Sequence, residues 1–308
     1  MRVLVTGGAG FIGSHVVKRL VEQGHDVTVL DDLSTGHLDV LNGPVEDGKV
    51  LVTRADIRDR AVVVKSIRGI DAIVHLAART SVPLSVEHPA ESLDINVNGT
   101  TNLLSACANG EVETFVFASS SAVYGDAKEL PTPEDYPLNP KSPYASSKML
   151  AEKACMAFRE NVGLPAICLR LFNVYGGAVN GDADPGVIGS FVRRFEKGEP
   201  PIIYGDGLQT RDFIHVENVA DAVAHTIEHP PSETVCNLGT GESITIGKLA
   251  EKVADLYGRR GVRPAYAPPR PGDVRHSQAD TSREEKLRIT PSIRLDEGLQ
   301  LALSSRRR

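Results

Sequence analysis

The sequence predicts a doubly wound α/β fold, in which a parallel sheet is followed by a smaller mixed α/β lobe. Three observations lead to this prediction. Short runs of apolar and β-branched residues recur in the first half of the chain, amphipathic helical stretches separate them, and the alternation stops near residue 175. Alternating strands and helices build a parallel sheet that helices cover on both faces.

The expected strands are nearly continuous in apolar residues, as buried parallel strands are. They fall at residues 2–6, 26–30, 49–53, 71–77, 113–119 and 165–171. Helices are expected between them at 11–23, 57–68, 90–109 and 143–162, and later at 187–197, 217–228 and 246–257. We expect residues 1–172 to form a first domain. Residues 173–308 should form mainly a second lobe, interleaved with the end of the sheet.

Composition excludes several classes of protein. The 308 residues carry a net charge of −6, whereas a nucleic-acid binder needs a basic excess. No apolar run approaches the ~18–20 residues of a membrane span, and the first apolar stretch runs into glycines rather than a signal-peptide cleavage site. The four cysteines are scattered without C-x-x-C spacing. We therefore expect reduced thiols in the cytoplasm and no metal site.

The segment "VLVTGGAGFIGSHVVKRL" places a glycine loop between a strand and an amphipathic helix. Gly7, Gly10 and Gly13 have the spacing of a dinucleotide-binding turn, where glycines allow close backbone approach and the helix N-terminus faces a pyrophosphate. Asp31 ends the next strand, where a carboxylate accepts from the adenosine ribose hydroxyls and repels a 2′-phosphate. The loop predicts a Rossmann-type site for NAD rather than NADP; a structural turn with a solvated aspartate is the alternative.

Hydroxyl side chains gather at the end of the fifth expected strand, in "ASSSAVYG". Tyr144 and Lys148 follow, on one face of a helix that Ser142 is expected to cap and Pro143 to begin. The Lys148 ammonium should lower the pKa of the Tyr144 phenol, which would make the tyrosine a general base. Such a pair alone is usually an ordinary helix surface, but the glycine loop and the serines favour catalysis.

Eight motifs, in this order, resemble the extended short-chain dehydrogenase/reductase family, in its NAD-dependent sugar-nucleotide epimerase/dehydratase branch. They are "TGGAGFIG", "HLAA" (75–78), "INVNGT" (95–100), "SSSAVYG", "YASSK", "LFNVYG" (171–176), "GDGLQTRDFIHV" (205–216) and "RPGDVRHSQAD" (270–280). The resemblance covers essentially the whole chain and is closest to the 4-epimerases of UDP-glucose or UDP-N-acetylglucosamine.

The resemblance implies roles for particular residues. Tyr144 would be the catalytic base, Ser120 would bridge the sugar O4 and this tyrosine, and Lys148 would hydrogen-bond the nicotinamide ribose. Residues implied in NAD binding are Gly7, Gly10, Phe11, Ile12, Gly13, Asp31, Asp32, Asp56, Ile57, Leu76, Ala77, Ala78, Asn96, Tyr144 and Lys148. Among them, Asp56 and Ile57 would flank the adenine. Residues implied in substrate binding are Ser81, Ser120, Ser121, Tyr144, Asn173, Val187, Ile188, Tyr204, Arg211, Arg270, Asp273 and Ser277.

The residues after Ser120 separate the chemistries that share this resemblance. In similar 4,6-dehydratases, Asp and Glu follow the Ser/Thr and supply the acid and base for water elimination. In similar UDP-glucuronate decarboxylases, Glu holds the second position. Here these positions are Ser121 and Ala122, which implies a 4-epimerase of UDP-glucose and UDP-galactose that passes through a 4-keto sugar. The small Ser277 would leave room for the N-acetyl group of UDP-GlcNAc or UDP-GalNAc.

Other functions stay open at this point. A UDP-glucuronate 4-epimerase could use Arg79 or Arg275 for the substrate carboxylate. A non-catalytic NAD-binding regulatory protein could share the fold, although such proteins typically lose the Tyr/Lys pair kept here. A reductase that releases its cofactor is a third interpretation.

The family also implies a homodimer formed through the helices at 90–109 and 143–162. The chain departs from the family in two segments. The loop at 176–186 lacks the usual Pro-Arg, and the C-terminal "GLQLALSSRRR" lacks the usual aromatic-rich last helix.

Overall fold

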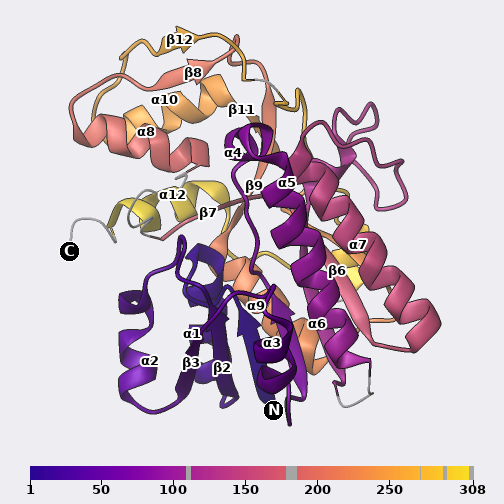
Figure 1. Ribbon diagram of the computed structural model, residues 1–308. Helices are drawn as coiled ribbons and strands as arrows, with labels where there is room; N and C mark the ends of the chain where they lie inside the picture. The colour runs from indigo at the N-terminus through magenta and orange to yellow at the C-terminus, as the bar shows by residue number, and fades with distance from the viewer. Residues whose placement is uncertain (109–111, 178–185, 271, 287–289, 305–308) are drawn as a thin grey trace.

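A seven-stranded parallel sheet forms the larger lobe of the computed structural model (Figure 1), which describes residues 1–108, 112–177, 186–270, 272–286 and 290–304. The strand order is β10-β6-β5-β4-β1-β2-β3, and every neighbouring pair is parallel. The strands are β1 (Arg2–Thr6), β2 (Asp26–Asp31), β3 (Val50–Arg54), β4 (Ala72–His75), β5 (Thr114–Ser120), β6 (Ala166–Leu171) and β10 (Val235–Leu238). The chain direction across the sheet reverses between β1 and β4, so a ligand crevice is expected above their carboxyl ends.

Helices cover both faces of this sheet, each over its own apolar core. The side chains of Val3 and Val5 pack with α1 (Phe11–Glu22) and α9 (Val216–Glu228) on one face. Leu4, between them, points to the opposite face, because side chains alternate along a strand. That second core is closed by α3 (Arg60–Ser66), α6 (Gly99–Cys107) and α7 (Pro143–Val162).

The smaller lobe is built mainly from the second half of the chain and lies at the top of the view in Figure 1. It contains a three-stranded sheet, a two-stranded sheet and helices around a third apolar core. Its elements are β7 (Asn173–Tyr175), α8 (Gly186–Glu196), β8 (Ile202–Tyr204), β9 (Thr210–His215), β11 (Ser243–Thr245), α10 (Ile246–Leu256), β12 (Ala265–Ala267) and α12 (Leu295–Ser304). The carboxyl ends of the large sheet therefore face a second wall, contributed by this lobe.

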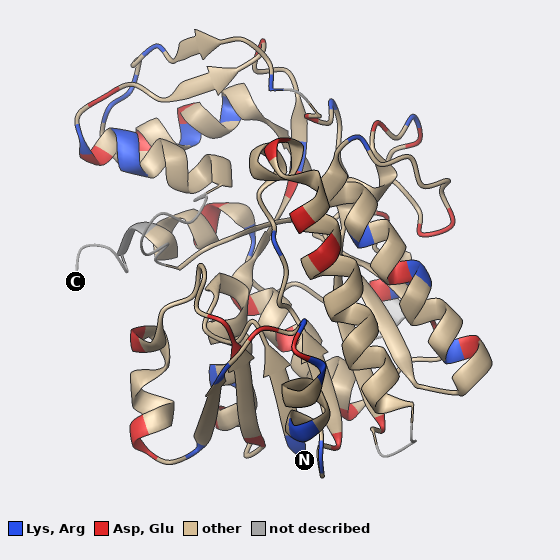
Figure 2. Ribbon diagram, in the orientation of Figure 1, with Lys and Arg blue, Asp and Glu red and all other residues tan. Residues whose placement is uncertain are grey.

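Short helical segments lie in the loops between the main strands and helices. They are a 3₁₀ turn at Leu38–Leu41, α2 (Asn42–Glu46), α4 (Val82–Glu87), α5 (Pro89–Leu93), a π-helical segment at Asp94–Asn98, a 3₁₀ turn at Ser121–Tyr124 and α11 (Ser282–Lys286). Acidic and basic residues are interspersed over both lobes (Figure 2). Among the described helices, none combines the length and apolar character that crossing a membrane requires.

The six strands expected in the first 171 residues, and three of the four helices, are confirmed, with ends that shift by a few residues. One expectation is wrong: residues 90–109 are not one regular helix, because the π-helical segment interrupts it between α5 and α6. The run "TVCNLG" contributes β10, an edge strand of the large sheet, and α9 packs against α1. Most of the 176–186 loop, residues 178–185, lies outside the described residues.

Candidate active site

The glycine loop joins β1 to α1, and its backbone packs so closely that side chains would not fit at Gly7 and Gly13. Gly7 has φ +71°, and a Cβ added at Gly13 would lie 2.1 Å from the Gly7 carbonyl oxygen. No described side chain caps the start of α1, and no acidic residue lies in its first turn, which Phe11 and Ile12 begin. The free N–H groups and the helix dipole favour an anion there. These features fit the pyrophosphate of a dinucleotide.

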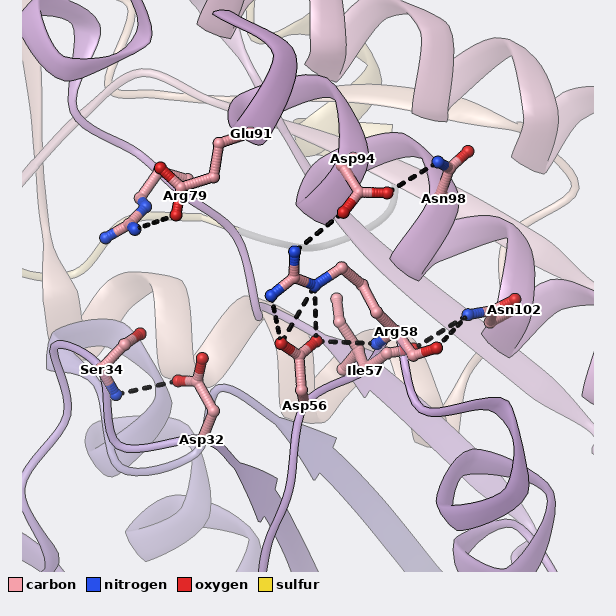
Figure 3. Close-up of polar contacts among 10 residues, drawn as sticks. All are labelled: Asp32, Ser34, Asp56, Ile57, Arg58, Arg79, Glu91, Asp94, Asn98 and Asn102. Carbon is pink, nitrogen blue, oxygen red and sulfur yellow. Dashed lines mark hydrogen bonds and ion pairs between the residues drawn. The ribbon is translucent and has the colours of Figure 1, made fainter. Parts of the chain in front are cut away.

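Two aspartates lie at the carboxyl end of β2, which Asp31 ends and Asp32 follows. Asp31 is buried and holds the glycine loop itself, since its carboxylate accepts from Ala9 N and Leu33 N, both at 2.9 Å. Burial raises the pKa of Asp31, and these two backbone hydrogen bonds lower it in part. Asp32 accepts from Ser34 N at 2.9 Å (Figure 3). Each carboxylate oxygen can accept a second hydrogen bond, so Asp31 can bind ribose hydroxyls while it braces the loop.

The loop after β3 carries the residues predicted to flank adenine. Ile57 is buried and packs against Gly99, the first residue of α6. The packing is close, since a Cβ added at Gly99 would lie 2.5 Å from the Ile57 side chain. The Asp56 carboxylate accepts from the guanidinium of Arg58 (Figure 3), and this hydrogen bond is the main cause that lowers the pKa of Asp56.

The segment Leu76–Ala78 follows β4 and lies beside the glycine loop. Leu76 N donates to the Thr6 carbonyl at 3.1 Å, and a Cβ at Gly7 would lie 2.7 Å from Ala77 N. The buried Asn96 side chain accepts from Arg79 N at 2.7 Å and donates to Arg79 O at 3.0 Å. Asn96 therefore fixes the course of the chain just after Leu76–Ala78, which are predicted to bind NAD.

The three predicted catalytic residues come together at the carboxyl end of β5. Ser142 caps α7 by accepting from Ala145 N at 3.1 Å, and Pro143 begins it, as expected. The first turns of α7 then place Tyr144 beside Ser120 on the wall of one cavity, close enough for the Ser120 hydroxyl to influence the Tyr144 phenol. Lys148 is 3% exposed, donates from Nζ to the Ala118 carbonyl at 2.7 Å and lies 4.8 Å from the centre of the Phe117 ring.

Burial dominates the ionisation of this group. It lowers the pKa of Lys148 to about 8, because the ammonium loses water. Burial also raises the pKa of Tyr144, while its hydrogen bond with Ser120 lowers it in part. The expected lowering of the Tyr144 pKa by Lys148 is therefore wrong for the protein alone. The ammonium is directed to Ala118, and desolvation outweighs its influence.

A cavity of about 230 Å³ opens beside this group. Seven of the predicted substrate residues line it: Ser120, Ser121, Tyr144, Asn173, Arg211, Asp273 and Ser277. Asp273 forms an ion pair with Arg211, whose side chain is held by the carbonyl of Thr210 at 2.7 Å. The cavity thus joins the hydroxyls predicted to be catalytic to a guanidinium on the opposite lobe.

The other predicted substrate residues do not line this cavity. Tyr204 and Arg270 stack on each other, with the guanidinium carbon 4.0 Å from the ring centre. Ser81 caps α4 by accepting from Leu84 N at 3.3 Å. Ile188 is buried in the core of the smaller lobe, and Val187 packs against it from the first turn of α8. Their predicted substrate contacts stay predictions.

Sequence reasoning missed several lining residues, notably Tyr124, Lys141 and His276. Lys141 lies one residue before the Ser142 cap, and His276 one residue before Ser277. Their nearness to predicted residues was the available signal. The Tyr124 hydroxyl donates to Asn237 Oδ1 at 2.6 Å, a partner that only the fold brings near.

A buried ion pair between β6 and α7 lies next to the candidate site. Arg170 on β6 binds Glu152 on α7 with two hydrogen bonds, of 3.0 and 2.5 Å, and the two residues are 4% and 0% exposed. Arg170 also donates to the Tyr124 hydroxyl at 2.8 Å. Ser119, next to Ser120, donates to Glu152 Oε2 at 2.8 Å. This network connects α7, β5 and β6 below the catalytic hydroxyls.

Comparisons with known proteins agree with this geometry. The family model described as "NAD dependent epimerase/dehydratase family" matches residues 3–239. The UDP-glucose 4-epimerase of Mycolicibacterium smegmatis is 36% identical over 97% of this chain and 96% of its own length. The Thermus thermophilus UDP-glucose 4-epimerase, solved in complex with NAD, is 37% identical with a TM-score of 0.90 over 100% of this chain and 99% of its own.

Two further solved structures bear on the reaction. The UDP-N-acetylglucosamine 4-epimerase of Methanobrevibacter ruminantium M1, in complex with UDP-N-acetylmuramic acid, is 37% identical with a TM-score of 0.92 over 99% of this chain and 97% of its own. The dTDP-glucose 4,6-dehydratase DesIV of Streptomyces venezuelae, with NAD bound, is 30% identical with a TM-score of 0.93 over 100% and 97%. Overall shape is therefore shared by epimerases and dehydratases, and the residues of the cavity must separate them.

Proposed function

Because the chain belongs to the NAD dependent epimerase/dehydratase family, we propose that it interconverts UDP-glucose and UDP-galactose by 4-epimerisation through a 4-keto sugar. The chain is an NAD-dependent enzyme of the isomerase class, similar to UDP-glucose 4-epimerases over nearly its whole length. The identity of the sugar and the keto intermediate are the parts that we propose.

One observation carries the choice of epimerisation over elimination. Ser121 and Ala122 line the cavity wall directly after Ser120. Among the described lining residues, Asp273 is the sole carboxylate, and it is paired with Arg211. Expelling water from a sugar needs a positioned acid and base, and this wall offers hydroxyl and methyl groups instead.

The chain's own residues would handle the proton at the sugar 4-hydroxyl. Tyr144 would accept it, with Ser120 hydrogen-bonded to both hydroxyl groups, and would return it when C4 is reduced on its other face. Bound NAD supplies the acceptor and donor of the C4 hydride. Lys148, on the same face of α7, would hydrogen-bond the nicotinamide ribose and favour the phenolate electrostatically.

The nucleotide would be held by the smaller lobe. Arg211 can bind a diphosphate through its planar guanidinium, and Asp273 can accept from the nucleotide ribose. Ser277 lines the cavity, and its small side chain supports our proposal that UDP-GlcNAc and UDP-GalNAc are also accepted. The likeness to a UDP-N-acetylglucosamine 4-epimerase supports the same extension.

The alternatives have less support. Arg79 is paired with Glu91 at 2.5 Å and Arg275 with Asp206 at 2.7 Å, and neither lines the cavity, so both candidate partners for a glucuronate carboxylate are engaged elsewhere. A regulatory protein would have no use for Tyr144 and Ser120 together on the wall of a cavity.

Separate incubations with UDP-glucose, UDP-GlcNAc and UDP-glucuronate, followed by chromatography of the nucleotide sugars, test the proposal. We expect UDP-galactose and UDP-GalNAc, with no net consumption of added NADH. A 4-keto-6-deoxy sugar, a pentose nucleotide or no product would refute it.

We also propose a cytoplasmic homodimer. The four cysteines are buried free thiols, which suits a reducing compartment. The outer side of α4, α5 and α7 exposes apolar residues, namely Leu84, Val86, Leu93 and Leu150, as a surface that binds another protein does. Light scattering should give twice the mass of the chain, and Leu150→Glu should shift the protein to the monomer.

A further inference from the structure

One guanidinium joins two carboxylates beside the predicted adenine site. Arg58 donates from Nε and Nη2 to Asp56, with the shortest contact 2.6 Å, and from Nη1 to Asp94 at 2.8 Å (Figure 3). Arg58 N also donates to Asp56 Oδ1 at 2.8 Å. The side-chain oxygens of Asp56 are thereby fixed in orientation by both the backbone and the side chain of Arg58.

The interaction of Arg58 with Asp94 also attaches the loop after β3 to the helical stretch that runs from α5 through the π-helical segment to α6. Asp94 begins the π-helical segment and also accepts from Asn98 at 2.8 Å. From α6, Asn102 donates to the carbonyls of Ile57 and Arg58 at 3.3 and 3.1 Å. The loop is therefore held by three hydrogen bonds, all of which depend on the side chains of Asp94 and Asn102 in this interrupted helix.

The π-helical segment also reaches the catalytic helix. Asn96, two residues after Asp94, donates to Ser147 Oγ at 2.8 Å, and Ser147 donates to the Tyr144 carbonyl at 2.7 Å. A continuous set of contacts thus runs from Asp56 through Arg58 and Asp94 to the start of α7. Irregular π-helical turns often occur at functional sites, and here the irregular turn lies between the two ends of the predicted cofactor site.

We propose that Arg58 is a positioning residue that keeps NAD bound, by orienting Asp56 toward adenine and by fixing its loop to the π-helical segment. This rests on the proposed placement of adenine beside Asp56 and Ile57. The planar guanidinium is suited to the task because it offers donors along two edges, whereas a lysine ammonium is a point charge that cannot bridge both carboxylates in the same way.

The expected effect is on cofactor retention rather than on folding. Arg58, Asp56 and Asp94 have side chains that are 39%, 31% and 46% exposed. Exposed ion pairs contribute only about 0–1 kcal/mol to stability. A matched control is Arg2, whose guanidinium pairs with Asp71 at 2.9 Å on the surface at the amino end of β1, far along the strand from the glycine loop.

The experiment measures the rate at which purified holoenzyme releases NAD, using a coupled dehydrogenase to trap the free cofactor. It needs no sugar nucleotide, so its outcome is independent of whether the epimerase proposal holds. We expect Arg58→Ala to release NAD at least ~10-fold faster than Arg2→Ala, Arg58→Lys to behave nearly like Arg58→Ala, and Asp94→Asn to be intermediate.

Three results would overturn the proposal. Release from Arg58→Ala at the rate of Arg2→Ala would show that the contact has no role in retention. Full rescue by Arg58→Lys would show that charge alone suffices. A large loss of thermal stability in NAD-free Arg58→Ala, absent in NAD-free Arg2→Ala, would show that the residue serves the fold, because the stabilisation by bound NAD is then removed from both variants.

Discussion

Replacing Lys148 by methionine should change how the stability of the protein depends on pH. The folded pKa of Lys148 is about 8 and its ordinary value is 10.5, because burial disfavours the ammonium. The unfolded chain therefore binds more protons than the folded protein between these values. The resulting destabilisation is absent above pH 10.5, grows as the pH falls through this window, and is complete below pH 8.

The size of this destabilisation follows from the difference of 2.5 between the folded and the ordinary pKa of Lys148. At about 1.36 kcal/mol per pKa unit, the buried ammonium costs about 3 kcal/mol at neutral pH and less than about 1 kcal/mol at pH 10. A methionine side chain at this position would carry no such charge. The Lys148→Met variant should therefore gain stability over the parent by an amount that shrinks by about 2 kcal/mol between pH 7 and pH 10.

Urea denaturation of the NAD-free proteins at pH 7, 8, 9 and 10 measures this. The lost hydrogen bond to Ala118 shifts all values equally, so the change with pH is the informative quantity. Lys153→Met, on the exposed side of the same helix, is the control and should show no such trend, because water surrounds its ammonium in both states. A stability difference for Lys148→Met that stays constant with pH would refute the argument.

Three other perturbations test the site. Tyr144→Phe removes the hydroxyl that bonds Ser120 and should lower kcat by about 10²–10⁴-fold while NAD stays bound; near-normal turnover would remove Tyr144 from its role. Gly13→Ala would bring a Cβ to 2.1 Å from the Gly7 carbonyl oxygen and should abolish NAD retention. Gly43→Ala is the control, because a Cβ there would have no atom within 4 Å, and it should retain NAD. The fluorescence of added NADH measures binding in both variants. Glu152→Gln leaves the buried Arg170 guanidinium without its counter-charge and should cost about 3–5 kcal/mol of unfolding free energy. The exposed Glu91→Gln is the control and should cost about 0–1 kcal/mol. Equal losses of the two variants in urea titrations would contradict the role of burial.

Features encoded within a few neighbouring residues were predictable from the sequence. The glycine loop and the Ser142–Pro143 start of α7 depend on local backbone preferences, and the structure places them as expected. The parallel strands follow from their apolar runs. These signals lie in contiguous segments, so a single sequence carries them.

Features that depend on tertiary contacts were not predictable. Glu152 looks like a solvent-facing charge on α7, and only the position of β6 shows that it is fully buried against Arg170. The interruption of the 90–109 helix accompanies contacts of Asn96 with Arg79 and Ser147, from distant segments. The pKa direction of Tyr144 depends on how deeply the fold buries it, a quantity that the i,i+4 spacing does not contain.

The position of β10 has a consequence for how the protein is made. Its strand, Val235–Leu238, pairs with β6, which ends much earlier in the chain at Leu171. A nascent chain that has emerged only as far as residue 172 would leave the hydrogen-bonding edge of β6 unpaired, and such edges recruit other strands. Synthesis must therefore proceed through about the first half of the smaller lobe, as far as Leu238, before the large sheet can close. Aggregation and chaperone capture should concentrate on ribosome-bound chains that end between residues 172 and 238.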